Sequence, residues 1–442
     1  MPRRAATAPA SRGRGERRVT ELAISEAARA TPDRTAIETL SRSLSFAACA
    51  AAVRAAAQPA RAIVATPSID TVLAVHAALA AHRPIALVHH RLAADEAERQ
   101  RAQVERAVLP ADAAVVLFTS GSTGAARGVV LPRSALIAAA NANAQHLGWR
   151  DTDRWLVALS LAHAGGLSIV IRCLAARRPI VLCDRDFDRE IVARLLERCT
   201  LASLVPTQLA ALLDDPAWRP PPALRAVLLG GAAAPPALLE RAARRGVPFL
   251  TSYGMTETLG QVATAPPDRA GDPGAPLVAL PGVTLEAGTA RAPAPIVVRA
   301  AMLATGYLDG TPIAPAFTTA DLGHVTGGAL HVVGRRDDVI ITGGENVHPA
   351  AIEVVLAATP GVRAACAFGV PDARWGQVVA AAVVVEPGFD ARAAAARWHA
   401  ALPAHARPRR LAVCAGLPVL PSGKVDRHAA STLPSNVIDY GR

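Results

Sequence analysis

The sequence contains almost no lysine. Lys424 is the only one among 47 lysines and arginines in 442 residues, and aromatic residues make up 3% of the chain. A nucleic-acid-binding surface needs cations gathered on one face and aromatic side chains for stacking, whereas these arginines are spread along the whole chain. The formal charge of +11 therefore indicates nonspecific association only, and we predict no nucleic-acid partner.

Three other features are absent. No apolar run is long enough to span a membrane, so we predict no membrane span. The six cysteines form no C-x-x-C pair and have no histidine at ligand spacing, which is typical of reduced thiols in a cytoplasmic protein. Residues 1–18 are basic and polar without the apolar stretch of a secretory signal, and we expect a disordered leader there. The sequence leaves open whether the protein forms a homodimer.

Length and periodicity predict more than one α/β unit. A chain of 442 residues with 51% hydrophobic content is long enough for two or more domains. Spaced apolar residues predict helices over 21–57, interrupted at 31–34, and 60–90 has the pattern of strand, helix and strand. This alternation predicts an α/β domain with mostly parallel strands.

Further elements follow along the chain. A buried strand is expected at 113–118, running into a Ser/Thr/Gly loop, and a helix at 132–146. The remaining predicted strands of this part are 155–159, 180–183, 225–229 and 295–299. Stretches rich in proline and glycine predict surface connections at 216–222 and 266–281.

A second alternating unit begins near residue 334. Its predicted elements are a strand at 339–342, a helix at 349–358 that begins with proline, and a strand at 378–385. We therefore place a domain boundary at about residue 337, between an N-terminal domain of 19–336 and a C-terminal domain of 337–442.

The loop after the 113–118 strand is the strongest local signal. Its glycines let the backbone turn tightly, and its hydroxyls and N–H groups can surround phosphate oxygens. It is not a Walker A loop, because G-x-x-x-x-G-K-[ST] is absent. A flexible surface turn fits poorly directly after so apolar a strand. The predicted phosphate-binding residues are Thr119, Ser120, Gly121, Ser122, Thr123, Gly124 and Arg127.

This loop resembles the phosphate-binding loop of the adenylate-forming superfamily of acyl-CoA synthetases, adenylation domains and luciferases. Loops of that superfamily usually end in Pro-Lys-Gly, where this chain has Ala126-Arg127-Gly128. The resemblance implies an α/β fold with a large N-terminal domain of two α/β subdomains plus a β-rich subdomain, and a small, mobile α+β C-terminal domain. It also implies ATP, Mg²⁺ and CoA as ligands.

Further motifs occur in the superfamily's order. The segment 251–257 resembles the one whose aromatic residue, here Tyr253, stacks on adenine. By the same resemblance Thr256 contacts the α-phosphate and Glu257 binds Mg²⁺, a role suited to a carboxylate when ATP supplies the other oxygens. Without the other motifs, the same segment would be typical of a buried tyrosine just before the start of a helix.

The motifs nearer the C-terminus imply ribose and CoA contacts. Asp321 resembles the acid that binds both ribose hydroxyls, as an acceptor-only carboxylate can. Arg335 resembles the arginine that also meets the ribose, and Asp337 the hinge residue. Gly343 and Gly344 lie in a segment that resembles the loop forming the CoA tunnel.

Lys424 falls where the superfamily carries its adenylation lysine. A lysine ammonium is a compact charge on a flexible stem, whereas guanidinium is a broad planar fork. A site between two close oxyanions therefore discriminates between them. Taken alone, Lys424 could equally be a stray surface lysine in an arginine-favouring sequence; the ordered motifs favour the catalytic role.

Within the superfamily, segments 199–209 and 226–233 resemble those of o-succinylbenzoate-CoA ligases, which act in menaquinone biosynthesis. By this resemblance Arg172 lies near the carboxylates of the substrate; the alternative is an arginine extending from a helix to solvent. The acid-binding residues implied are His163, Arg172, Gly230 and Gly231.

The sequence thus predicts an ATP-dependent acid–CoA ligase that forms an acyl-adenylate and then a thioester. One alternative is a ligase for another aryl acid, of the benzoate or anthranilate type, in secondary metabolism. An alternative of another class is a non-catalytic nucleotide-binding homologue, against which the presence of Lys424, Glu257 and Asp321 argues.

Overall fold

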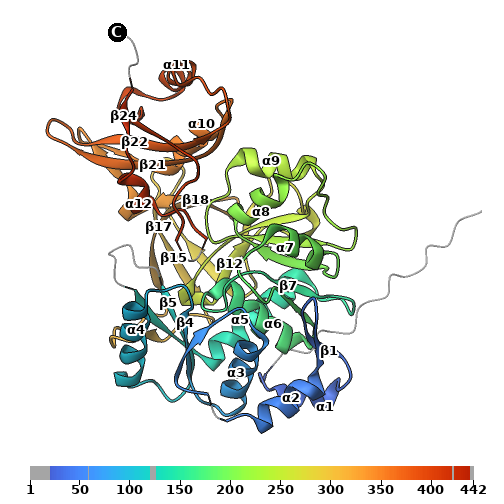
Figure 1. Ribbon diagram of the computed structural model, residues 1–442. Coiled ribbons are helices and arrows are strands. Elements are labelled where there is room, and N and C mark those ends of the chain that lie inside the picture. Colours follow the sequence, from blue (N-terminus) through green and yellow to red (C-terminus); the bar gives the residue numbers. More distant parts are fainter. Residues whose placement is uncertain (1–19, 58, 120–125, 421–422, 439–442) are drawn as a thin grey trace, which may run out of the picture.

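The computed structural model describes residues 20–57, 59–119, 126–420 and 423–438 (Figure 1). The expected leader and the loop residues Ser120 to Gly124 lie outside the described residues. Figure 1 shows a large body, coloured blue to yellow, and a smaller one, orange to red, at one end of it. None of the helices described is long and apolar enough to cross a membrane.

The first unit of the large body is a sheet in the order β16-β6-β5-β4-β3, with β3, β4 and β5 parallel. Every residue of β4 is buried, as expected where helices cover a parallel strand. Its strands are β3 (Ala62–Ala65), β4 (Ile85–His89), β5 (Ala113–Thr119), β6 (Arg127–Pro132) and β16 (Gly306–Tyr307). Its helices are α3 (Ile69–Ala80) and α4 (Ala94–Arg106).

The second unit is a longer sheet, whose order β1-β8-β7-β9-β10-β11 is parallel throughout. Its strands are β1 (Thr35–Glu38), β2 (Ser43–Ser45), β7 (Trp155–Val157), β8 (Ile180–Leu182), β9 (Leu201–Leu204), β10 (Ala226–Leu229) and β11 (Phe249–Met255). Its helices are α5 (Arg133–Leu147), α6 (Ala164–Ala176), α7 (Arg189–Leu196), α8 (Pro206–Leu213) and α9 (Pro236–Arg244).

The helical prediction over 21–57 is wrong in its middle. Two helices form, α1 (Ile24–Ala30) and α2 (Phe46–Ala55), but β1 and β2 lie between them as an antiparallel pair. Ile37 of β1 pairs in parallel with Ile180 of β8 and is fully buried. Strand β1 lies between β2 and the distant β8, and local periodicity does not encode the distant partner.

The third unit is antiparallel and continues the same sheet beyond β11. Its strands are β12 (Gly260–Thr264), β13 (Leu277–Ala279), β14 (Val283–Glu286), β15 (Ala294–Ala300), β17 (Phe317–Thr326) and β18 (Ala329–Arg335). The prediction of a plain surface connection at 266–281 is therefore partly wrong: the stretch contains a short helix, η2 (Pro267–Arg269), and strand β13. Strand β13 lies between β12 and β18, and Leu277 pairs with Leu330 of β18, 53 residues away in the chain.

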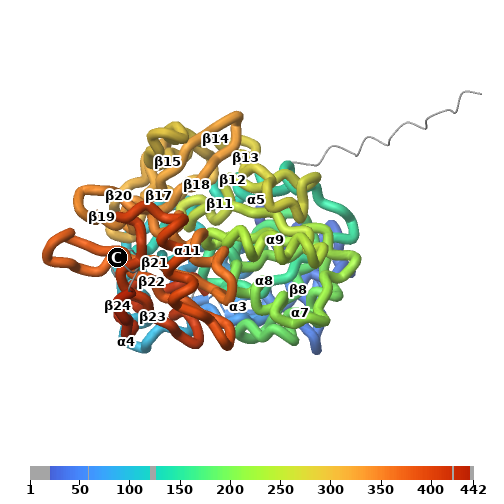
Figure 2. The backbone as a smooth tube through the Cα atoms, turned by 90° about the horizontal axis from the view of Figure 1, so that it is seen from above, coloured from blue at the N-terminus to red at the C-terminus, as the bar shows by residue number. Residues whose placement is uncertain are grey.

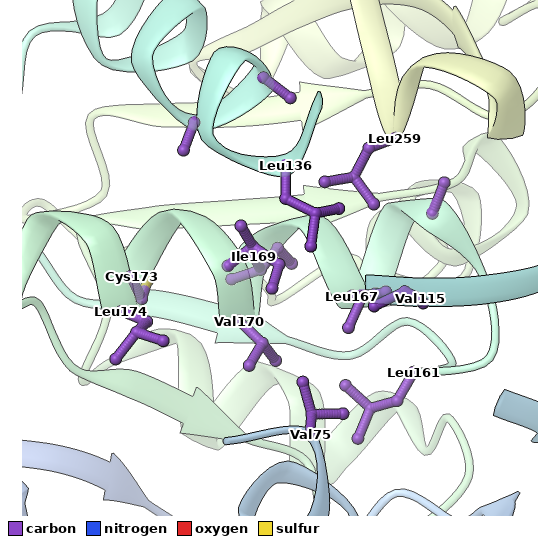
Figure 3. Packing of buried hydrophobic residues seen from close by; sticks show 14 of the residues in the cluster. Val75, Val115, Leu136, Leu161, Leu167, Ile169, Val170, Cys173, Leu174 and Leu259 are labelled. Carbon is purple, nitrogen blue, oxygen red and sulfur yellow. The ribbon is translucent and has the colours of Figure 1, made fainter. Parts of the chain in front are cut away.

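The two α/β units share one hydrophobic core, shown in Figure 3. Leu167 and Val170 of α6 lie among Leu136 of α5, Val115 of β5 and Val75 of α3, all fully or almost fully buried. Burying a side chain of this kind stabilises the fold by about 1.5–3 kcal/mol. Helix α6 is therefore held firmly between the two sheets, together with the polar residues that it carries.

The smaller body is the C-terminal domain, which we define as the residues from β19 onward. Its sheet has the order β20-β19-β22-β23-β24, with β21 paired to β22. Its own cores, around Trp398 and around Phe368, contain no residue of the large body among those described. Figure 2 shows this domain from above, beside α8 and α9.

The elements of the C-terminal domain follow the predicted alternation. Its strands are β19 (Ile340–Thr342), β20 (Glu345–Val347), β21 (Val362–Asp372), β22 (Gly376–Val385), β23 (Arg410–Cys414) and β24 (Asn436–Val437). Its helices are α10 (Pro349–Ala357), α11 (Ala391–Ala401), η4 (Ala404–Ala406) and α12 (Arg427–Ser431). A short helix, η3 (Arg336–Asp338), connects β18 to β19.

Candidate active site

Tyr253 and Asp321 meet at the junction of the parallel and antiparallel units. The Tyr253 hydroxyl at the end of β11 donates a 2.8 Å hydrogen bond to Oδ2 of Asp321 on β17. Arg335 of β18 is the direct cross-strand partner of Asp321. Burial, and then the negative charge of Asp321, raise the pKa of Tyr253, so the phenol stays protonated and donates. The structure thus brings together three residues expected at adenine and ribose.

Glu257 lies in the short helix η1 (Thr256–Thr258), between β11 and β12. The hydroxyl of Tyr307 donates to its Oε1 at 3.0 Å. Burial, and then the charge of Glu257, raise the pKa of Tyr307. Sequence reasoning missed Tyr307; the signal available was its rarity, because the chain has three tyrosines. Thr256 begins the same short helix and is half-buried.

The phosphate-loop strands lie beside this tyrosine. Thr119 at the end of β5 is paired in register with Arg127 at the start of β6, so the loop leaves and re-enters the sheet here. The guanidinium of Arg127 lies 3.6 Å from the centre of the Tyr307 ring and forms a 2.9 Å ion pair with Asp309. The cation at this end of the loop is therefore stacked on Tyr307 and paired with Asp309.

The surroundings of Glu257 suit a metal that arrives with its own ligands. Among the residues described, no group of three or more His, Cys, Asp or Glu side chains could hold a metal ion. Mg²⁺ keeps several waters and takes one or two carboxylates plus substrate phosphates. A single carboxylate, with one oxygen fixed by Tyr307, fits that form of binding.

Lys424 reaches this junction from the C-terminal domain. It lies on a β-hairpin in which Val419 bridges Val425 and the amide of Leu420 donates to the carbonyl of Lys424 at 2.7 Å. Its Cε is 3.9 Å from where a Cβ on Gly231 would stand. Gly231 has φ +82°, a conformation that favours glycine. This glycine, expected in acid binding, therefore lies beside the lysine side chain.

The electrostatic environment of Lys424 is mixed. Part of the side chain stays accessible, yet the surrounding protein removes enough water to lower the pKa of the ammonium, and the Arg335 cation lowers it further. Asp321 and Glu257 act in the opposite direction. The lysine thus lies within electrostatic range of three of the residues predicted to bind the nucleotide.

His163 marks the acid side of the site. It is the N-cap residue of α6, and its Nε2 is buried without a hydrogen-bond partner among the described residues. Its ring centre lies 5.0 Å from that of His89, at the end of β4. Burial, followed by the nearby His89 and Lys424, lowers the pKa of His163 to about 4. His163 is therefore neutral near pH 7, with a free ring nitrogen for a ligand.

Arg172, two turns further along α6, is buried, with 4% of its surface exposed. No described carboxylate lies within ion-pair distance, its Nε has no hydrogen-bond partner among the described residues, and its one ring contact is Trp155 at 5.6 Å. Burial lowers the pKa of its guanidinium to about 10. The alternative of an arginine extending to solvent is thereby excluded.

Arg172 also lies close to the segment predicted to bind Mg²⁺. Its Nη2 is 3.9 Å from where a Cβ on Gly260, three residues after Glu257, would stand. A buried cation without an anion is costly, so a negatively charged group beside Arg172 would lower that cost. Gly230, by contrast, follows the interior strand β10 and packs against β11: a Cβ there would lie 2.5 Å from Oγ of Ser252.

The two glycines expected to act with CoA lie apart from this cluster, whereas Asp337, the expected hinge residue, adjoins it. Asp337 in η3 forms ion pairs with Arg335 at 3.5 Å and Arg336 at 3.9 Å. Gly343 and Gly344 form the turn between β19 and β20, both with positive φ, and the Gly343 amide donates to the Trp375 carbonyl at 2.9 Å. In this structure the two glycines are exposed and contact their own domain.

The fold and the site together have the features expected of an enzyme that binds a nucleotide, with Lys424 at the predicted nucleotide site. Comparison with known proteins agrees. The family of AMP-binding enzymes matches residues 57–308, more than half of the chain, and the AMP-binding enzyme C-terminal domain matches residues 351–424. A 2-succinylbenzoate–CoA ligase from Listeria monocytogenes serotype 4b is 35% identical over 329 residues, which are 72% of this chain and 69% of that protein.

Solved structures give the same result. The chain superposes on the o-succinylbenzoate CoA synthetase of Bacillus subtilis in complex with its acyl-adenylate intermediate with a TM-score of 0.81, at 27% identity, over 94% of this chain and 99% of that one. For a double mutant of that enzyme bound to a product analogue, the TM-score is 0.64 at the same identity and coverage. The chain therefore belongs to the AMP-binding enzymes, and the predictions of an adenylate-forming fold and an AMP-forming ligase are confirmed.

Proposed function

We propose that this enzyme is a 2-succinylbenzoate–CoA ligase of menaquinone biosynthesis. The observation that carries the choice of acid is Arg172, a buried cation for which the described residues supply no anion. A 2-succinylbenzoate molecule has two carboxylates, of which only one is activated. The second, taken out of water in the site, needs a partner of opposite charge. The curated relatives of the same name support the assignment.

The residues of the nucleotide side have separate tasks. Tyr253 binds the adenine face, while Asp321, held by the Tyr253 hydroxyl, accepts from the ribose hydroxyls. Glu257 binds the Mg²⁺ that accompanies ATP, with Tyr307 fixing its orientation. Thr119 and Arg127, paired in register at the ends of β5 and β6, lie where the phosphates would be bound. Each role follows from the donor or acceptor that the side chain offers.

Lys424 supplies the positive charge for the first half-reaction. The substrate carboxylate attacks the α-phosphorus of ATP, and the products are the acyl-adenylate and pyrophosphate. Negative charge gathers on the α-phosphate and the attacking oxygen, between which a lysine ammonium fits. Stabilisation by preplaced charge and positioning explains the chemistry without a nucleophilic side chain.

The second half-reaction uses the other face of the C-terminal domain. The thiol of CoA displaces AMP from the acyl-adenylate and forms the thioester. We infer that η3, at Asp337, is the hinge about which the C-terminal domain rotates. The rotation brings Lys424 to the site for the first half-reaction and the Gly343–Gly344 turn for the second. The exposure of that turn away from the cluster supports the inference. The greater likeness to an acyl-adenylate complex supports the view that the present arrangement belongs to the first half-reaction.

We also propose that the enzyme works in the cytoplasm. All six cysteines are free thiols in the structure, and five of them are buried. Burial raises the pKa of Cys173 and of Cys199, the latter to about 12. These thiols are therefore unreactive, and free thiols persist in a reducing compartment.

A panel of acids tests the proposed function. The full-length enzyme is incubated with ATP, Mg²⁺, CoA and one acid at a time, and thioesters are identified by mass spectrometry. We expect 2-succinylbenzoate to give the highest kcat/KM, ahead of benzoate and anthranilate. A preference for benzoate or anthranilate would assign the chain to aryl-acid activation instead, and pyrophosphate release with none of the acids would indicate a non-catalytic homologue.

A further inference from the structure

Helix α8 contacts the C-terminal domain at both of its ends. Near its start, Oγ1 of Thr207 donates a 3.2 Å hydrogen bond to the carbonyl of Gly423, the residue before Lys424. Just after its last residue, the carboxylate of Asp214 forms a 3.2 Å ion pair with Arg363 of β21. Both bonds join residues of the large body to residues of the C-terminal domain, far apart in sequence.

The spacing of these two residues places them on one face of the helix. Thr207 and Asp214 are seven residues apart, which is about two turns of an α-helix and about 10 Å along its axis. Asp214 itself has right-handed helical dihedrals, φ −68° and ψ −19°, so the helical spacing extends from Thr207 to Asp214. Two contacts this far apart restrict rotation of the C-terminal domain more than a single contact does.

The start of α8 also packs closely against the hairpin that carries Lys424. A Cβ on Gly423, which has φ +80°, would lie 3.3 Å from Cγ2 of Val205. Val205 is the N-cap residue of α8, and Gln208 holds it by accepting from its amide at 3.2 Å. Gln208 in turn donates to the Ala158 carbonyl at 2.9 Å, so the docking end of the helix is fixed to the large body.

The far end is fixed in the same way. Asp214 accepts from Arg241 of α9 at 2.7 Å through Oδ1, while Oδ2 faces Arg363. The carboxylate is thus held by its own domain through one oxygen and presented to the C-terminal domain through the other. Its side chain is 37% exposed and that of Arg363 52%, so salt can weaken this contact.

We propose that helix α8 is the docking surface that selects the orientation in which Lys424 enters the site, with Thr207 and Asp214 as positioning residues. This inference rests on the proposed role of Lys424 in adenylation. Neither residue touches the reacting groups; each acts by holding the hairpin or the domain that carries the lysine. When the C-terminal domain turns for thioester formation, both bonds break, because their partners move with it.

The test separates the two half-reactions. Adenylation is measured as pyrophosphate release from acid and ATP, and thioester formation from supplied acyl-adenylate and CoA. Thr207→Val removes the hydroxyl but keeps the shape, and we expect adenylation to fall by about three- to tenfold, the effect of one hydrogen bond, with thioester formation unchanged or faster. Thr207→Ser keeps the hydroxyl and should restore adenylation.

Arg363→Gln tests the other end of the helix. We expect adenylation to fall by about two- to threefold at low salt, as for an exposed ion pair, and its salt dependence to weaken. Arg299→Gln is the matched control, because it breaks an ion pair with Glu286 of similar exposure and length, 3.0 Å, remote from α8. Adding Arg363→Gln to Asp214→Asn should cause little further loss, because Asp214→Asn already removes this ion pair together with the one to Arg241.

Failure of this inference differs from failure of the proposed function. If the unaltered enzyme releases no pyrophosphate with 2-succinylbenzoate, the assigned acid is wrong. A second outcome is that the unaltered enzyme releases pyrophosphate, but Thr207→Val and Arg363→Gln slow both half-reactions equally. A third is that their rates equal those of the Arg299→Gln control. In either case α8 does not select the adenylating orientation.

Discussion

The Tyr253 hydroxyl donates a 2.8 Å hydrogen bond to Oδ2 of Asp321, which joins the residue expected at adenine to the one expected at ribose. We expect Tyr253→Phe to raise the KM for ATP by about three- to tenfold, because Asp321 loses one donor that orients it. The ring remains, so kcat should change less. Asp321→Asn should raise the KM further. An unchanged KM in Tyr253→Phe would show that the bond does not orient the carboxylate.

Lys424 should serve adenylation and not thioester formation. Lys424→Ala is expected to abolish pyrophosphate release, since no other lysine exists in the chain, while still converting supplied acyl-adenylate and CoA to thioester. Lys424→Arg should restore little, because the guanidinium is a broad planar fork and cannot replace a compact charge between two close oxyanions. Equal damage to both half-reactions, or near-normal Lys424→Arg, would contradict this role.

Arg172 should discriminate between acids. Arg172→Met keeps most of the side-chain volume and removes the charge, so we expect the KM for 2-succinylbenzoate to rise by about tenfold or more, the effect of one charge-assisted hydrogen bond. The KM for benzoate should stay nearly constant. Arg189→Ala, at an exposed arginine of α7, is the control. Equal effects of Arg172→Met on both acids would remove the basis for assigning the dicarboxylate.

Glu257 should set the magnesium requirement. Glu257→Gln keeps the shape and loses the charge that attracts the ion, so pyrophosphate release should need a higher Mg²⁺ concentration for half-maximal rate. Tyr307→Phe keeps the carboxylate but frees its Oε1, and should show a smaller shift in the same titration. If Glu257→Gln has an unchanged requirement, the metal is held elsewhere.

His76 should weaken the fold in acid. It is fully buried on α3, its Nδ1 has no partner among the described residues, and burial lowers its pKa to about 4. In the unfolded chain it titrates near 6.5, so between these values the unfolded state binds a proton that the folded state does not. Stability is therefore lost as the pH falls through this window, by about 1.4 kcal/mol per unit at most.

Urea unfolding on either side of pH 6.5 measures this effect. His76→Leu should lose less stability than the unaltered enzyme when the pH is lowered, even though His89 and His163, with pKa values of about 4, contribute in both. An identical pH dependence of the two proteins would show that His76 takes up its proton without unfolding.

The sequence by itself determined the features that are local. The strand predicted at 113–118 became β5, the helix expected from residue 349 became α10, and glycine patterns fixed turns such as Gly343–Gly344. These follow from side-chain size, backbone freedom and hydrophobic period over a few residues. The motifs that indicated the family are equally short, which is why the adenylate-forming fold and enzyme class could be predicted without coordinates.

Only the tertiary structure decided which distant residues share an environment. Strand β1 was missed because one of its two partner strands, β8, lies more than 140 residues away. Tyr307 was missed as the partner of Glu257, and Thr207 as the partner of Gly423, because neither contact leaves a local pattern. Arg172 had two readings in the sequence, and burial without an anion separated them. Burial and charge pairing depend on every element that surrounds a side chain, and no short stretch of sequence contains that information.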